Sequence, residues 1–229
     1  MNCLPLNLNE TAPAVAEKTP LDIVAREAAG VFANARGSHD WEHTLRVLGL
    51  CKRIGPPEKA DMTVLCAAAY LHDIGRTEQD RSNGAICHAA KGAEMAKQIL
   101  EPLSLGIRRK ENIIHCVRTH RFRDGQTPRT TEARVLFDAD KLDAIGAVGI
   151  ARAYLFAGEL GACLHNPDLA PELAAPYTRN DTGSREYAVK LSRIKDRIMT
   201  TEGRRLAEER HAFMVRFFDR FLEEYSGRC

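Results

Sequence analysis

The sequence contains no CxxC pair, because its seven cysteines are scattered at positions 3, 51, 66, 87, 116, 163 and 229. Their odd number and wide spacing argue against a zinc finger or a disulfide framework, so we expect small buried side chains in a reducing compartment. No apolar run approaches the length of a membrane span, and residues 1–20 hold three prolines but no basic segment leading into an apolar one. We therefore expect a cytoplasmic protein with a loose tail over residues 1–20 and no membrane partner.

The sequence also has no large surplus of charge of one sign. It contains 33 Lys and Arg and 31 Asp and Glu, which gives a formal net charge of +2. Such a chain has no overall field that would attract nucleic acid, so we expect no nucleic acid polymer as a partner. Its 229 residues, of which 44% are hydrophobic, can bury one sizeable core. We expect a single domain over residues 21–229.

Sustained strand alternation is absent, whereas helical periodicity recurs along the chain, so the fold is predicted to be all-α. Residues 61–74 are apolar over most of the helix circumference, which is typical of a central buried helix. Other helices are expected over residues 21–35, around His43, over 85–100, over 108–120, from 131 onward, and twice after 183. Residues 164–183 contain three prolines and form one long irregular stretch, of a length usual for binding loops or lids.

The dipeptide His72-Asp73 ends the apolar run of residues 64–71 and is followed by Ile74-Gly75. Gly75 is suited to end a helix as a left-handed residue, which would put Asp73 in the last turn, where the helix dipole disfavours a carboxylate. A bound cation would reverse this penalty. Further candidate ligands are His43, within residues 40–44, and Asp140, within the acidic residues 138–143.

Two imidazoles and two carboxylates suit manganese, magnesium, iron, cobalt, nickel or zinc rather than calcium or copper(I). Four protein ligands leave coordination positions for water and for a substrate oxygen. Such an ion lowers the pKa of its bound water and polarises a phosphoryl oxygen, so phosphate esters and anhydrides are the natural substrates. The residues predict hydrolysis at a divalent metal ion and leave the identity of the metal open.

The ordered set His43, His72-Asp73 and Asp140 resembles the HD-domain metal-dependent phosphohydrolase superfamily, in which these residues hold one divalent ion. Residues 138–147, 149–152 and 209–214 are similar to a bacterial stand-alone branch, and the resemblance runs from about residue 36 to the C-terminus. It implies a single-domain HD-type helical bundle with a central buried helix that carries the metal. It also implies one divalent ion as the cofactor.

Asp73 and Lys141 are catalytic candidates beside the predicted ion. In some members of the superfamily, a Glu three residues after the Asp of the pair helps to activate water, but Arg76 stands there in this sequence. Asp143 is therefore the candidate base, with Glu78 as an alternative. Basic side chains would hold the substrate phosphates, and the candidates are Lys141, Arg76, Arg152, Lys190 and Lys195.

His88 and His120 resemble the histidines with which some members of the superfamily bind a second ion. The second of these motifs normally has paired histidines, whereas Thr119 precedes His120 here. We therefore expect one ion, with His88 and His120 binding substrate, and a second ion as the alternative.

The resemblance over residues 138–152 includes nucleoside triphosphate pyrophosphohydrolases, which release pyrophosphate and leave a monophosphate. We therefore expect a small phosphorylated substrate, a nucleotide, that is attacked at the α-phosphorus. A nucleotidase or other phosphomonoesterase, or a phosphodiesterase, is the alternative enzyme. A nucleotide-sensing binding module is the alternative of another class, and the intact set of four ligands favours an enzyme over it.

Overall fold

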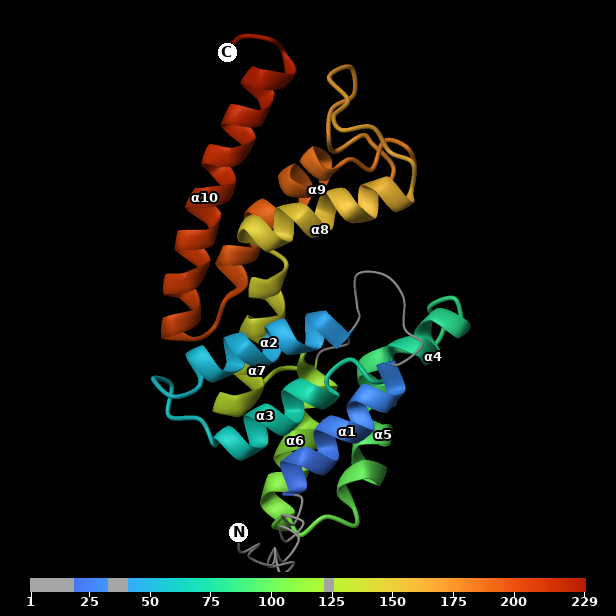
Figure 1. Cartoon of the computed structure of the whole chain (residues 1–229), viewed down its shortest axis with the longest axis vertical. Coiled ribbons are helices and arrows are strands. Elements are labelled where there is room, and N and C mark those ends of the chain that lie inside the picture. The colour runs from blue at the N-terminus through green and yellow to red at the C-terminus, as the bar shows by residue number, and fades with distance from the viewer. Residues whose placement is uncertain (1–18, 33–40, 122–125) are drawn as a thin grey trace, which may run out of the picture.

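The computed structural model describes residues 19–32, 41–121 and 126–229, and every regular element in these ranges is a helix (Figure 1). The first layer consists of α1 (Pro20–Phe32), α2 (Trp41–Ile54), α3 (Met62–Leu71), α4 (Arg76–Arg81), α5 (His88–Leu100), α6 (Ile107–Thr119) and α7 (Thr131–Asp143). The prediction of an all-α fold is confirmed. The predicted tail lies almost wholly outside the described residues, which contain no helix with the length and hydrophobicity of a transmembrane span.

Helix α3 forms the centre of this layer, because it packs against α1, α2, α6 and α7. Seven of its ten residues are buried, as the apolar run predicts. The side chain of Asp61 caps its start by accepting hydrogen bonds from the backbone N–H groups of Thr63 and Val64. The cap fixes where α3 begins and the apolar packing fixes its axis. Together they place its C-terminal end.

The left-handed conformation predicted for Gly75 is wrong. Its φ is −83°, in the right-handed region, and α3 ends at Leu71 rather than at residue 74. A Cβ atom at position 75 would lie 2.3 Å from the carbonyl oxygen of His88 and 2.6 Å from the backbone nitrogen of Gly92. Glycine is therefore required by the close approach of α5, which brings His88 against the end of α3.

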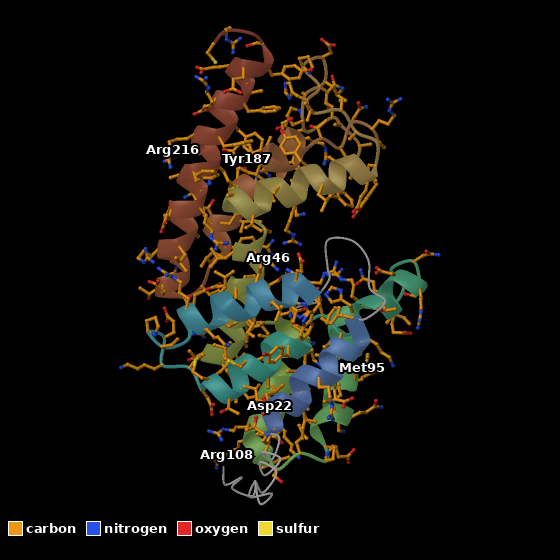
Figure 2. All side chains as sticks on the ribbon, in the orientation of Figure 1. Asp22, Arg46, Met95, Arg108, Tyr187 and Arg216 are labelled. Carbon is orange, nitrogen blue, oxygen red and sulfur yellow. The ribbon has the colours of Figure 1, made fainter. Side chains whose placement is uncertain are left out.

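A second layer stands above α2 and α7 in Figure 1 and consists of α8 (Gly146–Glu159), α9 (Gly183–Val189), the 3₁₀ helix η1 (Leu191–Arg197) and α10 (Thr201–Tyr225). Tyr187 of α9 stacks on Phe218 of α10 with ring centroids 4.0 Å apart, and the side chains of this layer pack mainly on one another (Figure 2). Residues 160–182, between α8 and α9, contain no helix, in agreement with the irregular stretch predicted there.

Asp138 of α7 connects the two layers. Its buried carboxylate accepts hydrogen bonds from the backbone N–H of Met199 (2.9 Å), the backbone N–H of Thr200 (2.7 Å) and the hydroxyl of Thr200 (2.6 Å). Thr200 is also the N-cap of α10, and its hydroxyl accepts a hydrogen bond from the backbone N–H of Gly203. Helix α10 therefore begins at a point that α7 fixes.

Candidate metal centre

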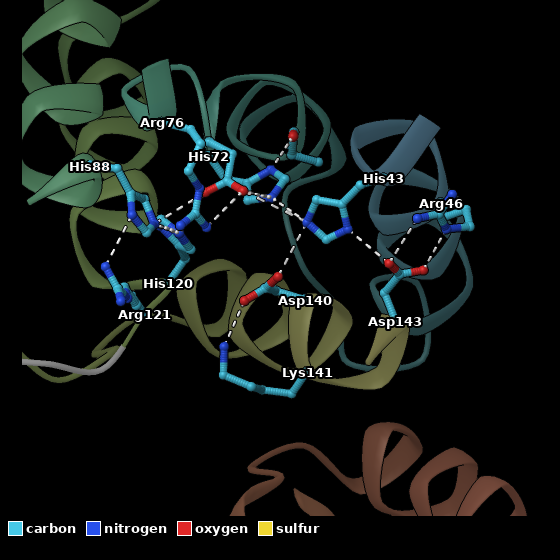
Figure 3. A network of polar contacts seen from close by, with 12 residues as sticks. His43, Arg46, His72, Arg76, His88, His120, Arg121, Asp140, Lys141 and Asp143 are labelled. Carbon is cyan, nitrogen blue, oxygen red and sulfur yellow. Dashed lines mark hydrogen bonds and ion pairs between the residues drawn. The ribbon is translucent and has the colours of Figure 1, made fainter. Parts of the chain in front are cut away.

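Three helices bring the four predicted ligands to one buried point (Figure 3). His43 comes from α2, His72 and Asp73 directly follow α3, and Asp140 comes from α7. The Nε2 atom of His43 lies 3.2 Å from Nε2 of His72 and 3.4 Å from Oδ1 of Asp140. The Oδ2 atom of Asp73 lies 3.9 Å from Nε2 of His43 and 3.8 Å from Nε2 of His72. The ordered set in the sequence is thus one cluster in space.

The other ring nitrogen of each histidine faces an oxygen acceptor. The Nδ1 atom of His43 lies 2.8 Å from Oδ2 of Asp143, and that of His72 lies 2.8 Å from the carbonyl oxygen of Ala69. Because these oxygens accept hydrogen bonds, the proton of each neutral ring is on Nδ1 and the lone pair is on Nε2. Two lone pairs 3.2 Å apart repel each other unless a cation lies between them. Metal-binding histidines have this arrangement, so the donor set fits a divalent ion.

The pKa values of the cluster also indicate a demand for positive charge. Burial lowers the pKa of His72 to about 4, so its ring is neutral at pH 7 and can be a ligand. Burial acts in the same direction on His43, but hydrogen bonds with Asp140 and Asp143 outweigh it and raise the pKa of His43 to about 9. Burial disfavours the Asp140 carboxylate, but Lys141 and His43 hold its pKa well below the usual range. The carboxylates therefore require a cation, which is either a proton on His43 or a metal ion.

Metal uptake at pH 7.5 is expected to release about one proton per chain, because His43 must lose its stabilised proton before Nε2 can bind the ion. The pKa of His43 is raised from 6.5 to about 9, so its proton stabilises the metal-free fold below pH 6.5, and this contribution disappears as the pH rises to 9. Metal affinity should accordingly increase over the same pH range. Calorimetric metal titrations in two buffers of different ionisation enthalpy measure the proton release, and equal heats in both buffers would contradict it.

A second group of ligand atoms shares Asp73. The Nε2 atoms of His88, at the start of α5, and His120, at the end of α6, lie 3.2 and 3.4 Å from Oδ1 of Asp73 and 3.2 Å from each other. Their Nδ1 atoms lie 2.8 Å from Oε1 of Gln79 and 2.7 Å from the carbonyl oxygen of Val117, respectively. The three facing atoms are close enough to hold one ion. The described residues thus offer donors for a second ion as well as the single one expected, and metal content decides between the two.

The contacts of Asp143 favour a positioning role over the predicted role as a base. Its Oδ2 atom lies 2.8 Å from Nδ1 of His43 and 2.7 Å from Nη1 of Arg152, and its Oδ1 atom lies 2.8 Å from Nε of Arg46. Burial alone would raise the pKa of Asp143, but the hydrogen bonds from His43 and Arg46 lower it to about 2. A carboxylate held so firmly as an anion is a poor proton acceptor at neutral pH. Asp143 instead orients the imidazole of His43.

A cavity of about 670 Å³ opens beside the cluster, and His88, His120 and Asp140 form part of its wall. Seven cationic side chains line the same cavity: Arg76, Arg121, Lys141, Arg152, Lys190, Arg193 and Arg197. Guanidinium and ammonium groups at this density suit a ligand that carries several phosphates. We call this space the cationic cavity.

Lys195 is the one predicted substrate-binding residue that does not line the cationic cavity. Its Nζ atom lies 3.2 Å from Oδ1 of Asp196 and 3.2 Å from Oε1 of Glu208. Both carboxylates are largely exposed, so Lys195 belongs to a surface ion-pair network. The other predicted cations and both predicted histidines line the cavity.

Arg193 and Arg197 line the cationic cavity although they are not among the candidates from the sequence. In the part of the chain that the structure describes, neither guanidinium has a carboxylate partner. Arg193 follows Lys190 by three residues, which is one turn of a 3₁₀ helix. The seven-residue spacing of Arg197 gives no such relation, so only the structure shows that it reaches the cavity.

Comparison with known proteins agrees with the geometry of the site. The HD domain family model matches residues 40–145, which contain every candidate ligand. YpgQ of Bacillus subtilis is 33% identical over 202 residues, covering 86% of this chain and 89% of YpgQ. The crystal structure of YpgQ in complex with ADP matches with a TM-score of 0.69 and 31% identity over 89% of this chain and 96% of that chain. A predicted HD superfamily hydrolase from an uncultured Thermotogales bacterium matches with a TM-score of 0.62 and 30% identity over 90% and 91% of the two chains. The chain therefore belongs to the HD-domain superfamily of hydrolases.

Proposed function

We propose that the protein is a divalent-metal-dependent phosphohydrolase that converts nucleoside triphosphates to monophosphates and pyrophosphate. The observation that carries this proposal is the cationic cavity beside the candidate ligands. One or two cations suffice for a monophosphate, whereas seven suit a triphosphate whose charge extends along the cavity. The crystallisation of the related YpgQ with ADP supports a nucleotide as the ligand.

The cations nearest to the candidate ligands would act on the phosphoryl group that is attacked. A divalent ion held by the four candidate ligands would supply an acidified water molecule and polarise a phosphoryl oxygen. Nη2 of Arg76 lies 3.3 Å from Oδ2 of Asp73, and Nζ of Lys141 lies 2.6 Å from Oδ2 of Asp140. In the proposed role, both side chains donate to non-bridging oxygens and neutralise the charge that develops in the transition state.

The cations of α9–η1 would bind the leaving group. Lys190, Arg193 and Arg197 reach the cavity from the second layer, whereas the candidate ligands belong to the first. The phosphates held by these three cations would therefore differ from the phosphate held at the candidate metal ligands. This arrangement favours attack on the α-phosphorus at the metal ligands, with the β- and γ-phosphates departing while the cations hold them. Because both layers form the cavity wall, we also propose that residues 21–229 work as one domain.

A panel of nucleoside mono-, di- and triphosphates and a chromogenic phosphate ester, each tested with several divalent ions, examines the proposal. Hydrolysis in ¹⁸O-labelled water should put the label into the nucleoside monophosphate and leave the pyrophosphate unlabelled. Phosphate release from monophosphates, with triphosphates untouched, would establish a nucleotidase instead. Nucleotide binding without turnover in any of the ions would favour a sensing module.

Replacing both Arg193 and Arg197 with Ala is expected to raise the KM for triphosphates at least about tenfold while leaving the metal content unchanged. The physical reason is the loss of two charge-assisted hydrogen bonds to the leaving phosphates, each of which contributes on the order of 1 kcal/mol at a partly exposed site. Lys195→Ala is the matched control, because Lys195 lies on the same helix but outside the cavity. An unchanged KM in the double variant, or an equal rise in the control, would refute the role of these arginines.

A further inference from the structure

A second cavity of about 620 Å³ adjoins the cationic cavity and differs from it in chemistry. The two share part of their walls, including Arg76, Arg152 and Lys190, so they lie side by side. The second cavity adds one face of α8, formed by Gly149, Ala153 and Phe156, together with Pro176, and its wall also includes the acidic Asp80, Asp181 and Glu186 and the basic Arg185. A ligand that is polyanionic at one end and has apolar faces with polar edges at the other would match this division.

Tyr177 lines both cavities and lies where they meet. It belongs to the irregular residues 160–182 and is 76% exposed. Its ring and that of Phe156 are nearly perpendicular, with centroids 6.1 Å apart and an interplanar angle of 84°. Because the Tyr177 side chain is largely exposed and lines the second cavity, it offers an aromatic surface to a planar group there.

The backbone of Tyr177 is held in a conformation that a tyrosine rarely adopts, with a φ of 60°. Its N–H donates to Oδ2 of Asp181 at 2.7 Å, and Oδ1 of Asp181 lies 2.7 Å from Nη1 of Arg185. Nε of Arg185 donates in turn to the carbonyl oxygen of Ala174 at 2.9 Å. The Asp181 and Arg185 side chains are only 7% and 13% exposed, so the anchor is largely buried. Strained residues that are anchored in this way cluster at ligand sites.

We propose that the second cavity binds the nucleobase and that the Tyr177 ring is the surface on which the base stacks. This inference rests on the proposed function, because the triphosphate in the cationic cavity would direct the nucleoside toward the second cavity. Base–aromatic stacking tolerates any base, since every base has a π face. The site would thus favour nucleotides over inorganic polyphosphates with little discrimination among bases.

The test compares the binding of two probes that share phosphates but not a base. The Kd values of the α,β-methylene analogue of ATP and of inorganic tripolyphosphate are measured by calorimetry in the presence of Mg²⁺. Tyr177→Ala should weaken binding of the nucleotide roughly tenfold to a hundredfold and leave tripolyphosphate binding unchanged. Tyr177→Phe, which keeps the ring, should bind both probes like the wild type. Leu173→Ala is the matched control, because Leu173 lies in the same segment, is also 76% exposed and lines neither cavity.

Two results would overturn the inference: unchanged nucleotide binding in Tyr177→Ala, or an equal weakening of both probes, which would mean that Tyr177 only holds its segment in place. Absence of turnover by the wild-type protein rejects the proposed reaction but not the inference, because the binding comparison needs no hydrolysis. The two proposals can therefore fail separately.

Discussion

Asp73→Asn is expected to lose its metal and to reduce hydrolysis by at least about a hundredfold, the effect of removing one group that stabilises the transition state. The two carboxylate oxygens of Asp73 face different histidine pairs, Oδ2 toward His43 and His72 and Oδ1 toward His88 and His120. An amide keeps the shape of the side chain but removes its charge. Elemental analysis of the purified variant, together with turnover of the best triphosphate, measures the effect.

The matched control for this experiment is Asp143→Asn, a second buried carboxylate beside His43 that is not a candidate ligand. Loss of a hydrogen bond that orients a ligand weakens metal affinity by about 10–100-fold without removing the site. The wild-type metal content distinguishes one ion from two, and Asp73→Asn should lose all of it in either case. A fully loaded, active Asp73→Asn protein would show that the cluster is not the metal site.

Asp138→Ala is expected to destabilise the fold by about 3 kcal/mol while metal binding persists. The substitution leaves the buried N–H of Thr200 and the partly buried N–H of Met199 without their acceptor. For a chain of this length, that loss lowers the Tm by roughly 6–12 °C. Thermal unfolding monitored by circular dichroism measures the loss of stability. Metal analysis of the folded protein at low temperature measures whether metal binding persists.

Asp196→Ala serves as the control for stability, because Asp196 is exposed and its ion pair with Lys195 is at the surface. Such a change usually alters stability by no more than about 0.5 kcal/mol. If Asp138→Ala lost its metal as readily as Asp73→Asn, the expectation that the hydrogen bonds holding α10 act independently of the metal centre would be wrong.

The sequence predicts the helices well, because their apolar periodicity is a local property. The starts of the helices that were predicted in the first layer differ from the observed ones by at most three residues, and α3 is buried as its composition indicates. The short α4 and the whole of α8 were not predicted, and the first helix expected after residue 183 is divided into α9 and the 3₁₀ helix η1. The error at Gly75 has a different origin, because the contact that requires glycine there comes from Gly92 and His88 on another helix. The sequence therefore indicates that position 75 needs glycine but does not show that a neighbouring helix is the reason.

For a similar reason, the sequence does not show the contacts of Asp143. Its partner His43 lies 100 residues earlier in the chain, and only the packing of α2 on α7 brings the two together. Arg193 and Arg197 are similar in this respect, because only the placement of η1 beside α7 and α8 brings them to the wall of the cationic cavity.

The hydrogen bonds of Asp138 also help to hold the two walls of the cationic cavity together in the folded chain. Arg197 stands two residues before the anchored Met199, so η1 is held close to α7 in the folded chain. The repulsion among the seven cations is thus offset once, during folding, and not again at each encounter with a ligand. A polyanion approaching the protein meets a preorganised field, which favours rapid association that slows as the ionic strength rises.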